Sequence, residues 1–88
     1  GEQSKFNSTY SSEERNEDMD LLRQLSAREL TFLNYCCSEM TYKEIADVME
    51  ITSRTVDGYR EALFAKLNIK SRIGLVIFAI KTGVYKIQ

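Results

Sequence analysis

Basic side chains gather in one part of the sequence, residues 51–72, where five Lys or Arg residues accompany two acidic ones. Residues 1–20 instead carry six acidic and two basic residues, so the overall net charge of −1 is an average over two unlike segments. A local excess of positive charge is the pattern expected of a surface that meets phosphate groups. Within it, Arg54 and Arg60 can each pair with guanine through two hydrogen bonds. The chemistry that these residues predict is recognition of DNA.

Four further basic residues are expected to position the protein on the DNA backbone. They are Lys43, Lys66, Lys70 and Arg72. Contacts with phosphates strengthen binding and make it depend on salt, but they carry no information about the base sequence. Selectivity is therefore expected from the two arginines and from their neighbours on the same helix.

The segment around the arginines, residues 51–67, has the pattern of a helix with two unlike faces. One stripe is apolar and predicts the face that packs on the core: Val56, Tyr59, Leu63 and Leu67. The opposite stripe predicts the face presented to a partner: Arg54, Asp57, Gly58, Glu61 and Ala65. A glycine destabilises a helix by about 1 kcal/mol relative to alanine. Gly58 on an exposed face therefore suggests that a partner approaches the backbone closely.

The sequence offers few residues suited to catalysis, because it contains no histidine. The commonest general base and the commonest metal ligand are thus missing. Cys36 and Cys37 are adjacent, so a disulfide between them would be strained, and we interpret them as small buried thiols in a reducing cytosol. We expect no enzyme, no cofactor and no metal site.

Capping signals divide the rest of the chain into four helices. Capping boxes at Ser26 and Thr41 predict helices to about Ser38 and Met49, respectively. Thr52 or Ser53 would cap the third helix, and Ser71 a fourth helix to about Thr82, ended by Gly83. A short helix, a tight turn and a longer helix with an exposed polar face predict a helix-turn-helix. The expected fold is an all-α four-helix bundle without a winged element.

The N-terminal residues are expected to stand apart from this bundle. Residues 1–20 are acidic and almost without aliphatic side chains, which predicts a flexible tail or linker, either a trailing end or a tether to another domain. Residues 19–25 could add a short helical lead-in. The DNA-binding domain would then span residues 21–88.

The fourth helix is apolar nearly all round. Leu75, Val76 and Ala79 can face the core, which leaves a second apolar face made of Ile73, Ile77 and Ile80. This surplus face predicts contact with a second copy of the chain. The alternative is complete burial against Leu21, Leu22 and the first helix.

At this point the residues resemble a known family. The sequence from Leu25 to about Tyr85 is similar to the LuxR-type helix-turn-helix, the output domain of NarL/FixJ-class response regulators. The matching pieces are Leu25-Ser26-x-Arg28-Glu29, Lys43-Glu44-Ile45-Ala46, Ile51-Thr52-x-x-Thr55-Val56, Lys66-Leu67-x-Ile69-x-Ser71-Arg72 and Gly83. The resemblance implies that Val56 and Leu63 lie in the core and that the fourth helix forms a dimer. It also implies that Thr52, Thr55, Lys66, Ser71 and Arg72 lie near phosphates.

Three positions depart from the family pattern. Glu39 stands where glycine is usual, which puts the shape of that turn in question. Tyr59 replaces a frequent histidine and can still pack and offer a hydroxyl group. Asp57 replaces a usual lysine, and its carboxylate either accepts a hydrogen bond from a base such as cytosine N4 or orients a neighbouring arginine.

We therefore expect a sequence-specific transcriptional regulator that binds double-stranded DNA as a homodimer in the cytoplasm, with RNA polymerase as a further candidate partner. The third helix would enter the major groove. The expected DNA-binding residues are Lys43, Thr52, Ser53, Arg54, Thr55, Asp57, Gly58, Arg60, Glu61, Lys66, Lys70, Ser71 and Arg72. Two alternatives stay open: a helix-turn-helix that binds a protein instead of DNA, and a promoter-binding module like region 4 of sigma factors. No apolar run approaches the roughly 18 residues of a membrane span, so no membrane partner is expected.

Overall fold

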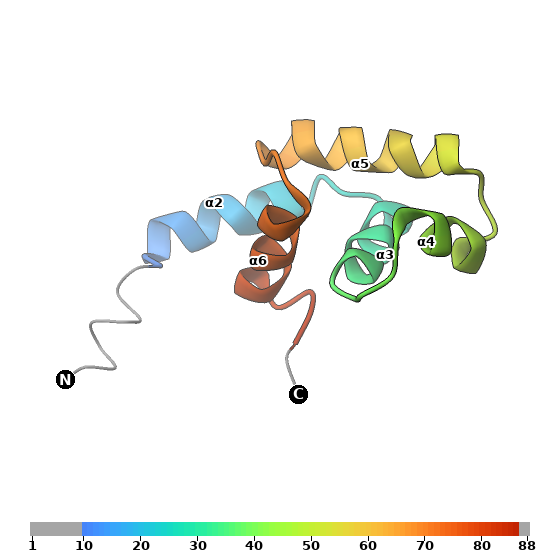
Figure 1. Ribbon diagram of the computed structural model, residues 1–88. Coiled ribbons are helices and arrows are strands. Elements are labelled where there is room, and N and C mark those ends of the chain that lie inside the picture. Colours follow the sequence, from blue (N-terminus) through green and yellow to red (C-terminus); the bar gives the residue numbers. More distant parts are fainter. Residues whose placement is uncertain (1–9, 87–88) are drawn as a thin grey trace.

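The computed structural model describes residues 10–86, and every regular element in this range is an α-helix (Figure 1). The helices are α2 (Ser12–Leu22), α3 (Ala27–Cys36), α4 (Tyr42–Met49), α5 (Ser53–Leu67) and α6 (Arg72–Thr82). The expected all-helical fold is confirmed, and residues 10–86 contain no strand that could form a wing. This range holds five helices where the sequence predicts four. Residues 1–9 of the expected tail lie outside the described part of the chain.

Helix α2 corrects the expectation that the tail reaches residue 20. Ser11 caps the helix by accepting a hydrogen bond from the backbone N–H of Glu14 at 3.1 Å, and acidic residues in the first turn suit the positive end of the helix dipole. At the other end, Leu21 and Leu22 pack against the core. The helix is thus held by a cap and by two apolar side chains at its last turn. Because these contacts lie at its two ends, the apolar content of the segment alone did not predict the whole of helix α2.

The starts of the other helices follow the capping signals in the sequence. Ser26 and Thr41 each form a complete capping box, in which the side chain accepts from a backbone N–H and the carboxylate of Glu29 or Glu44 accepts from the cap residue in return. Side-chain caps also open the last two helices: Thr52 for α5 and Ser71 for α6. These local predictions are confirmed, and Thr52 rather than Ser53 is the cap of α5.

The turns between the helices are short and need few glycines. Glu50 and Asn68 end α4 and α5 in the left-handed backbone region, with φ of 59° and 55°, and Gly83 does so after α6 with φ of 83°. Within residues 10–86 these are the three residues with positive φ. Glu39 is not among them, so the turn after α3 forms without the left-handed conformation that would favour a glycine there.

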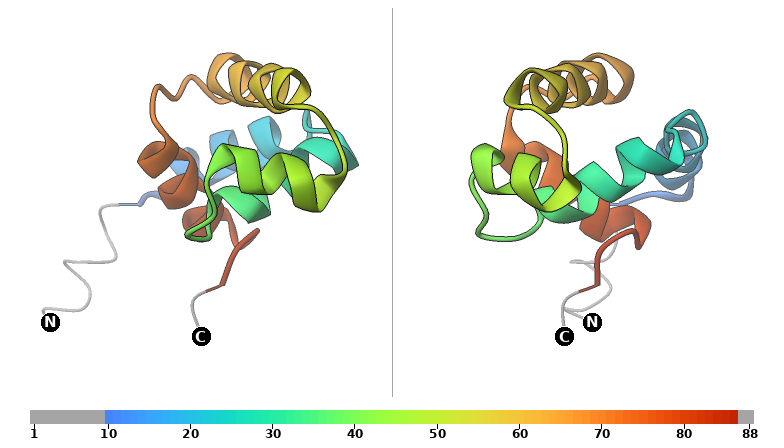
Figure 2. Two further views of the ribbon diagram at one scale, coloured as in Figure 1. Left: turned by 45° about the vertical axis from the view of Figure 1, so that its right-hand side comes forward. Right: turned by 90° about the vertical axis from the view of Figure 1, so that its right-hand side faces the viewer.

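The core lies where α3, α4, α5 and α6 meet. Its fully buried side chains come from all four helices and include Phe32, Leu33, Ile45, Leu63 and Leu75. Residues 50–52 join α4 to α5, and the two helices pack against each other, which is the predicted helix-turn-helix arrangement. Helix α5 runs along one edge of the molecule in every view, with the other helices on one side of it (Figures 1 and 2).

Candidate nucleic-acid interface

The two predicted stripes of α5 are present. Val56, Leu63 and Leu67 are buried in the core. Tyr59 is half-buried and stacks on Phe32 with 5.8 Å between ring centroids. The exposed residues of α5 on the opposite side include Arg54, Asp57, Gly58, Glu61 and Ala65. We call these five residues the outward face.

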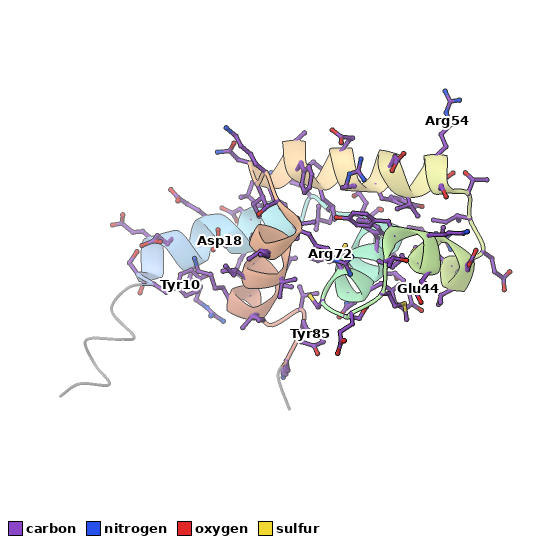
Figure 3. All side chains as sticks on the ribbon, in the orientation of Figure 1. Tyr10, Asp18, Glu44, Arg54, Arg72 and Tyr85 are labelled. Carbon is purple, nitrogen blue, oxygen red and sulfur yellow. The ribbon has the colours of Figure 1, made fainter. Side chains whose placement is uncertain are left out.

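Arg54 projects from the first turn of α5 away from the body of the molecule (Figure 3). Its side chain forms no hydrogen bond or ion pair with any other described residue. Gly58 lies one turn further along, and a Cβ atom added there would meet nothing within 4 Å. The outward face therefore offers a free guanidinium beside a bare stretch of helix backbone.

Arg60 does not share the exposed position of Arg54. Its side chain is only 27% exposed and lies at the edge of α5 over the ring of Tyr42, 5.2 Å from the centroid. Its NH1 contacts Oδ1 of Asp57 at 3.2 Å, and its NH2 contacts Oε2 of Glu61 at 3.5 Å. The guanidinium is thus shared between two carboxylates and an aromatic ring.

The N-terminus of α5 is exposed and rich in hydroxyl groups. Oγ1 of Thr52 accepts from the backbone N–H of Thr55 at 3.1 Å and lies 2.9 Å from the hydroxyl oxygen of Thr55. Lys43 is exposed in the first turn of α4, a different helix, and Ser53 is exposed beside the two threonines. Helix N-termini favour negative charge, so this group can receive a phosphate.

Lys66 is held within the fold. Its Nζ lies 2.9 Å and 3.0 Å from the two carboxylate oxygens of Glu29, whose side chain is only 9% exposed. Burial raises the pKa of Glu29, but hydrogen bonds from Ser26 and Lys66 outweigh this effect, so the pKa lies below its usual value. The ion pair ties the end of α5 to the start of α3. The carboxylate already neutralises the cation that the resemblance places near a phosphate.

Arg72 also has partners inside the molecule (Figure 3). Its Nε donates to the carbonyl oxygen of Cys36 at 3.1 Å, and its NH2 donates to that of Ser38 at 3.1 Å. The guanidinium lies 5.0 Å from the ring centroid of Tyr42. These contacts satisfy carbonyl groups at the end of α3, where helices leave acceptors unpaired. Lys70, two residues before Arg72, is exposed, so its charge is available to a ligand.

The hydroxyl group of Ser71 has a local role. Its Oγ accepts from the backbone N–H of Gly74 at 3.0 Å and so caps α6. Gly74 is itself close to the preceding turn, because a Cβ atom added there would come 2.6 Å from Cγ2 of Ile69. The turn between α5 and α6 is therefore closely packed.

Sequence reasoning missed the partners of these basic residues. Glu29 was recognised only as part of a capping box, and Tyr42 only as the first residue of a helix. Glu29 is 37 residues from Lys66, and Cys36 is 36 residues from Arg72. The sequence shows only that an acid and an aromatic residue are present, and neither could be matched to a distant cation without the fold.

The apolar face of α6 is exposed, as the sequence predicts. Ile73 is 73% exposed, Ile77 51% and Ile80 39%. Helix α2 packs beside α6 but does not cover these side chains. The alternative of complete burial within the domain is therefore wrong.

Both cysteines are free thiols. Cys36 is buried, and burial raises its pKa to about 12. Cys37 is partly exposed, and burial is also the main cause of its raised pKa. The interpretation of the pair as packed thiols holds for Cys36 and only in part for Cys37.

None of the helices formed by residues 10–86 is long and apolar enough to cross a membrane.

Comparison with known proteins gives one family. Residues 23–79, more than half of the chain, match bacterial regulatory proteins of the luxR family. This match confirms the resemblance found in the sequence. It is a match to a regulatory family and not to an enzyme family. No solved structure matches the chain significantly.

Several curated proteins are similar to the chain. A Bordetella pertussis protein named as the virulence-factor transcription regulator BvgA is 40% identical over 62 residues, 70% of this chain and 30% of the relative. The transcriptional regulatory protein TdiR of Thauera aromatica is 34% identical over 68 residues, 77% of this chain and 30% of the relative. The fimbriae Z protein of Escherichia coli is 36% identical over 55 residues, 62% of this chain and 26% of the relative. The chain thus spans less than a third of the length of these relatives.

Proposed function

The chain belongs to the luxR family of bacterial regulatory proteins, and we propose that it is the sequence-specific DNA-binding part of a transcriptional regulator. Helix α5 would enter the major groove by its N-terminal half, as the second helix of a helix-turn-helix does. The observation that carries this proposal is the outward face of α5. There, Arg54 is free of partners among residues 10–86, while the opposite side of the helix is buried.

Phosphate contacts would come from groups that the fold leaves available. The exposed hydroxyl groups of Ser53 and Thr55 lie at the N-terminus of α5, and the exposed side chains of Lys43 and Lys70 lie on α4 and before α6. Lys66 and Arg72 already have acceptors inside the domain. We therefore assign the salt-dependent part of binding mainly to the first group.

A second copy of the chain would pack on the apolar face of α6. Ile73, Ile77 and Ile80 expose a row of branched side chains, and such a row is expected to meet a partner. Two copies related by a two-fold axis would present two α5 helices to DNA, which matches an inverted repeat. The names of the relatives support regulation of transcription, and RNA polymerase is a candidate second partner of the whole protein.

The proposal is tested by titrating the 88-residue chain against a pool of random duplexes and then against the selected site at several salt concentrations. We expect a defined site and an affinity that falls as salt rises. Arg54→Ala should weaken binding roughly tenfold and relax preference at one base pair, because one arginine contact discriminates by about 1–3 kcal/mol.

Arg15→Ala is the matched control, because Arg15 lies in the first half of α2. Helix α2 begins at the opposite end of the molecule from the start of α5 (Figure 1). The control substitution should leave the preference unchanged. Binding that is weak, indifferent to salt and without sequence preference would favour the alternative of a module that binds protein.

A further inference from the structure

Two acidic residues of the outward face share one arginine. Asp57 is 58% exposed and Glu61 69% exposed, and both contact the guanidinium of Arg60. We propose that Asp57 accepts a hydrogen bond from the N4 amino group of a cytosine in the major groove, and that Arg60 is the residue that positions its carboxylate. This inference rests on the proposed function, because it requires α5 to lie in the groove.

The place of Asp57 on α5 suits contact with a base edge. It lies three residues after Arg54, close to one helical turn, in the half of the helix that is expected to enter the groove. An isolated carboxylate there would be repelled by the phosphates on both sides of the groove. The guanidinium of Arg60 at 3.2 Å offsets that charge, so a carboxylate can be carried into the groove.

Arg60 is held in place by an aromatic ring that packs on the core. Its guanidinium lies over the ring of Tyr42, and that ring stacks on the fully buried Phe32 with 6.3 Å between centroids. A cation over an aromatic ring is held by electrostatic attraction. The ion pair engages Oδ1 of Asp57, which leaves Oδ2 to accept a hydrogen bond from DNA. A chain of contacts thus runs from the core to a defined acceptor on the outward face.

The chemistry of the major groove selects cytosine. Hydrogen-bond donors there are the N4 amino group of cytosine and the N6 amino group of adenine. Adenine also presents its N7 acceptor beside the amino group, and this acceptor repels a carboxylate. Guanine and thymine present acceptors only. A carboxylate with one free oxygen therefore discriminates in favour of cytosine.

The test uses the full 88-residue chain, selection from random duplexes, and competition between duplexes that differ at one base pair. The wild-type protein should require cytosine at one position of the site. Asp57→Ala should reduce this preference for cytosine roughly tenfold and leave the base preferences at the other positions unchanged. Asp57→Asn should shift the preference toward adenine, because an amide can pair with both N6 and N7. Glu17→Ala on α2 is the charge-matched control, and it should leave every preference unchanged.

The role of Arg60 is tested in the same assay. Arg60→Gln should weaken binding to all duplexes and reduce the cytosine preference, because two carboxylates then lack their cation. Arg60→Lys should restore most of the affinity but less of the preference, since lysine lacks the planar fork of arginine. Thermal unfolding of each variant separates this effect from loss of the fold, because a purely structural role would move the unfolding temperature and not the base preference.

Two outcomes overturn the inference while the proposed function stands. The first is a wild-type site whose base preferences are all kept by Asp57→Ala. The second is an unchanged cytosine preference in Arg60→Gln, which removes the positioning role. If wild type selects no site at all, the proposed function fails and this inference fails with it.

Discussion

The two ends of α5 hold similar cations in different ways. At the N-terminal end, Arg54 projects from the molecule and has no partner among residues 10–86. At the other end, Lys66 is bound to Glu29. Just beyond it, Arg72 is bound to the carbonyl groups of Cys36, the last residue of α3, and of Ser38. A cation becomes part of the fold where the fold offers it an acceptor, and it stays available to a ligand where none is offered. This difference predicts opposite results for substitutions at the two ends.

The largest effect on stability is expected at Arg72. Arg72→Ala removes two hydrogen bonds from a charged donor and leaves the carbonyl group of the buried Cys36 without this partner, while the carbonyl group of Ser38 is exposed to water. We expect a loss of about 3 kcal/mol in the free energy of unfolding, measured by urea denaturation. Lys70→Ala, at an exposed position two residues earlier, should change it by less than about 0.5 kcal/mol. Similar losses in both variants would contradict the comparison.

The next largest effect is expected at Lys66. Lys66→Met keeps the aliphatic stem but leaves the carboxylate of Glu29, only 9% exposed, without its cation. We expect a loss of about 2 kcal/mol, less than for a fully buried pair because Lys66 is 39% exposed. The measurement is urea denaturation at pH 7, with Lys43→Met as a control at an exposed lysine.

The same ion pair predicts how stability depends on pH. Because the pKa of Glu29 is lowered on folding, its contribution is full above the usual value of 4.5 and is lost as the pH falls through the lower folded value. Wild type should therefore lose stability more steeply than Lys66→Met below about pH 4.5. Parallel curves for the two proteins would show that Lys66 does not lower the pKa of Glu29.

A smaller effect is expected at Tyr42, the first residue of α4. Its ring is close to both Arg60 and Arg72, so Tyr42→Leu removes two cation–π contacts and the stacking on Phe32. We expect a loss of about 1 kcal/mol in the free energy of unfolding. Tyr42→Phe keeps the ring and should stay within about 0.5 kcal/mol of wild type. A large effect of Tyr42→Phe would assign the role to the hydroxyl group.

The smallest effect on stability is expected at Arg54. Arg54→Ala should change the free energy of unfolding by less than about 0.5 kcal/mol, because the side chain is exposed and unpaired. The same variant should lose DNA affinity in the titration described above. Loss of stability together with loss of binding would show that Arg54 also supports the fold, and the difference between the two ends would then disappear.

The parts of the fold that could be predicted are those that depend on neighbouring residues. Ser26 and Thr41 were identified as caps because a capping box needs only four consecutive residues. The buried stripe of α5 followed from spacing alone, since helical geometry places Val56 and Leu63 on one side. Of helix α2 only the last turn was anticipated, as a lead-in over residues 19–25, because the apolar side chains that dock on the core are confined to that turn.

The sequence could predict which basic residues belong to the candidate site. It could not predict which of them point outward and which are bound within the fold. The sequence predicts both Arg54 and Arg60 as base readers, but in the structure the guanidinium of Arg60 lies over the ring of Tyr42 at the edge of α5. Lys66 and Arg72 match family positions, yet their acceptors lie on α3 and the turn after it, more than thirty residues away. Which basic residues remain available therefore depends on packing between distant segments.

Gly58 has a consequence for how the outward face of α5 can change over time. Nothing lies within 4 Å of the point where its side chain would begin, so a side chain other than proline can start there without a clash at its Cβ atom. Nearly every replacement would also stabilise the helix, by up to about 1 kcal/mol for alanine. Replacement of Arg54 should leave stability nearly unchanged, whereas replacement of Gly58 by alanine should raise it slightly. Gly58 is thus a site at which binding preference could drift in evolution, or be redesigned in the laboratory, without compensating changes elsewhere.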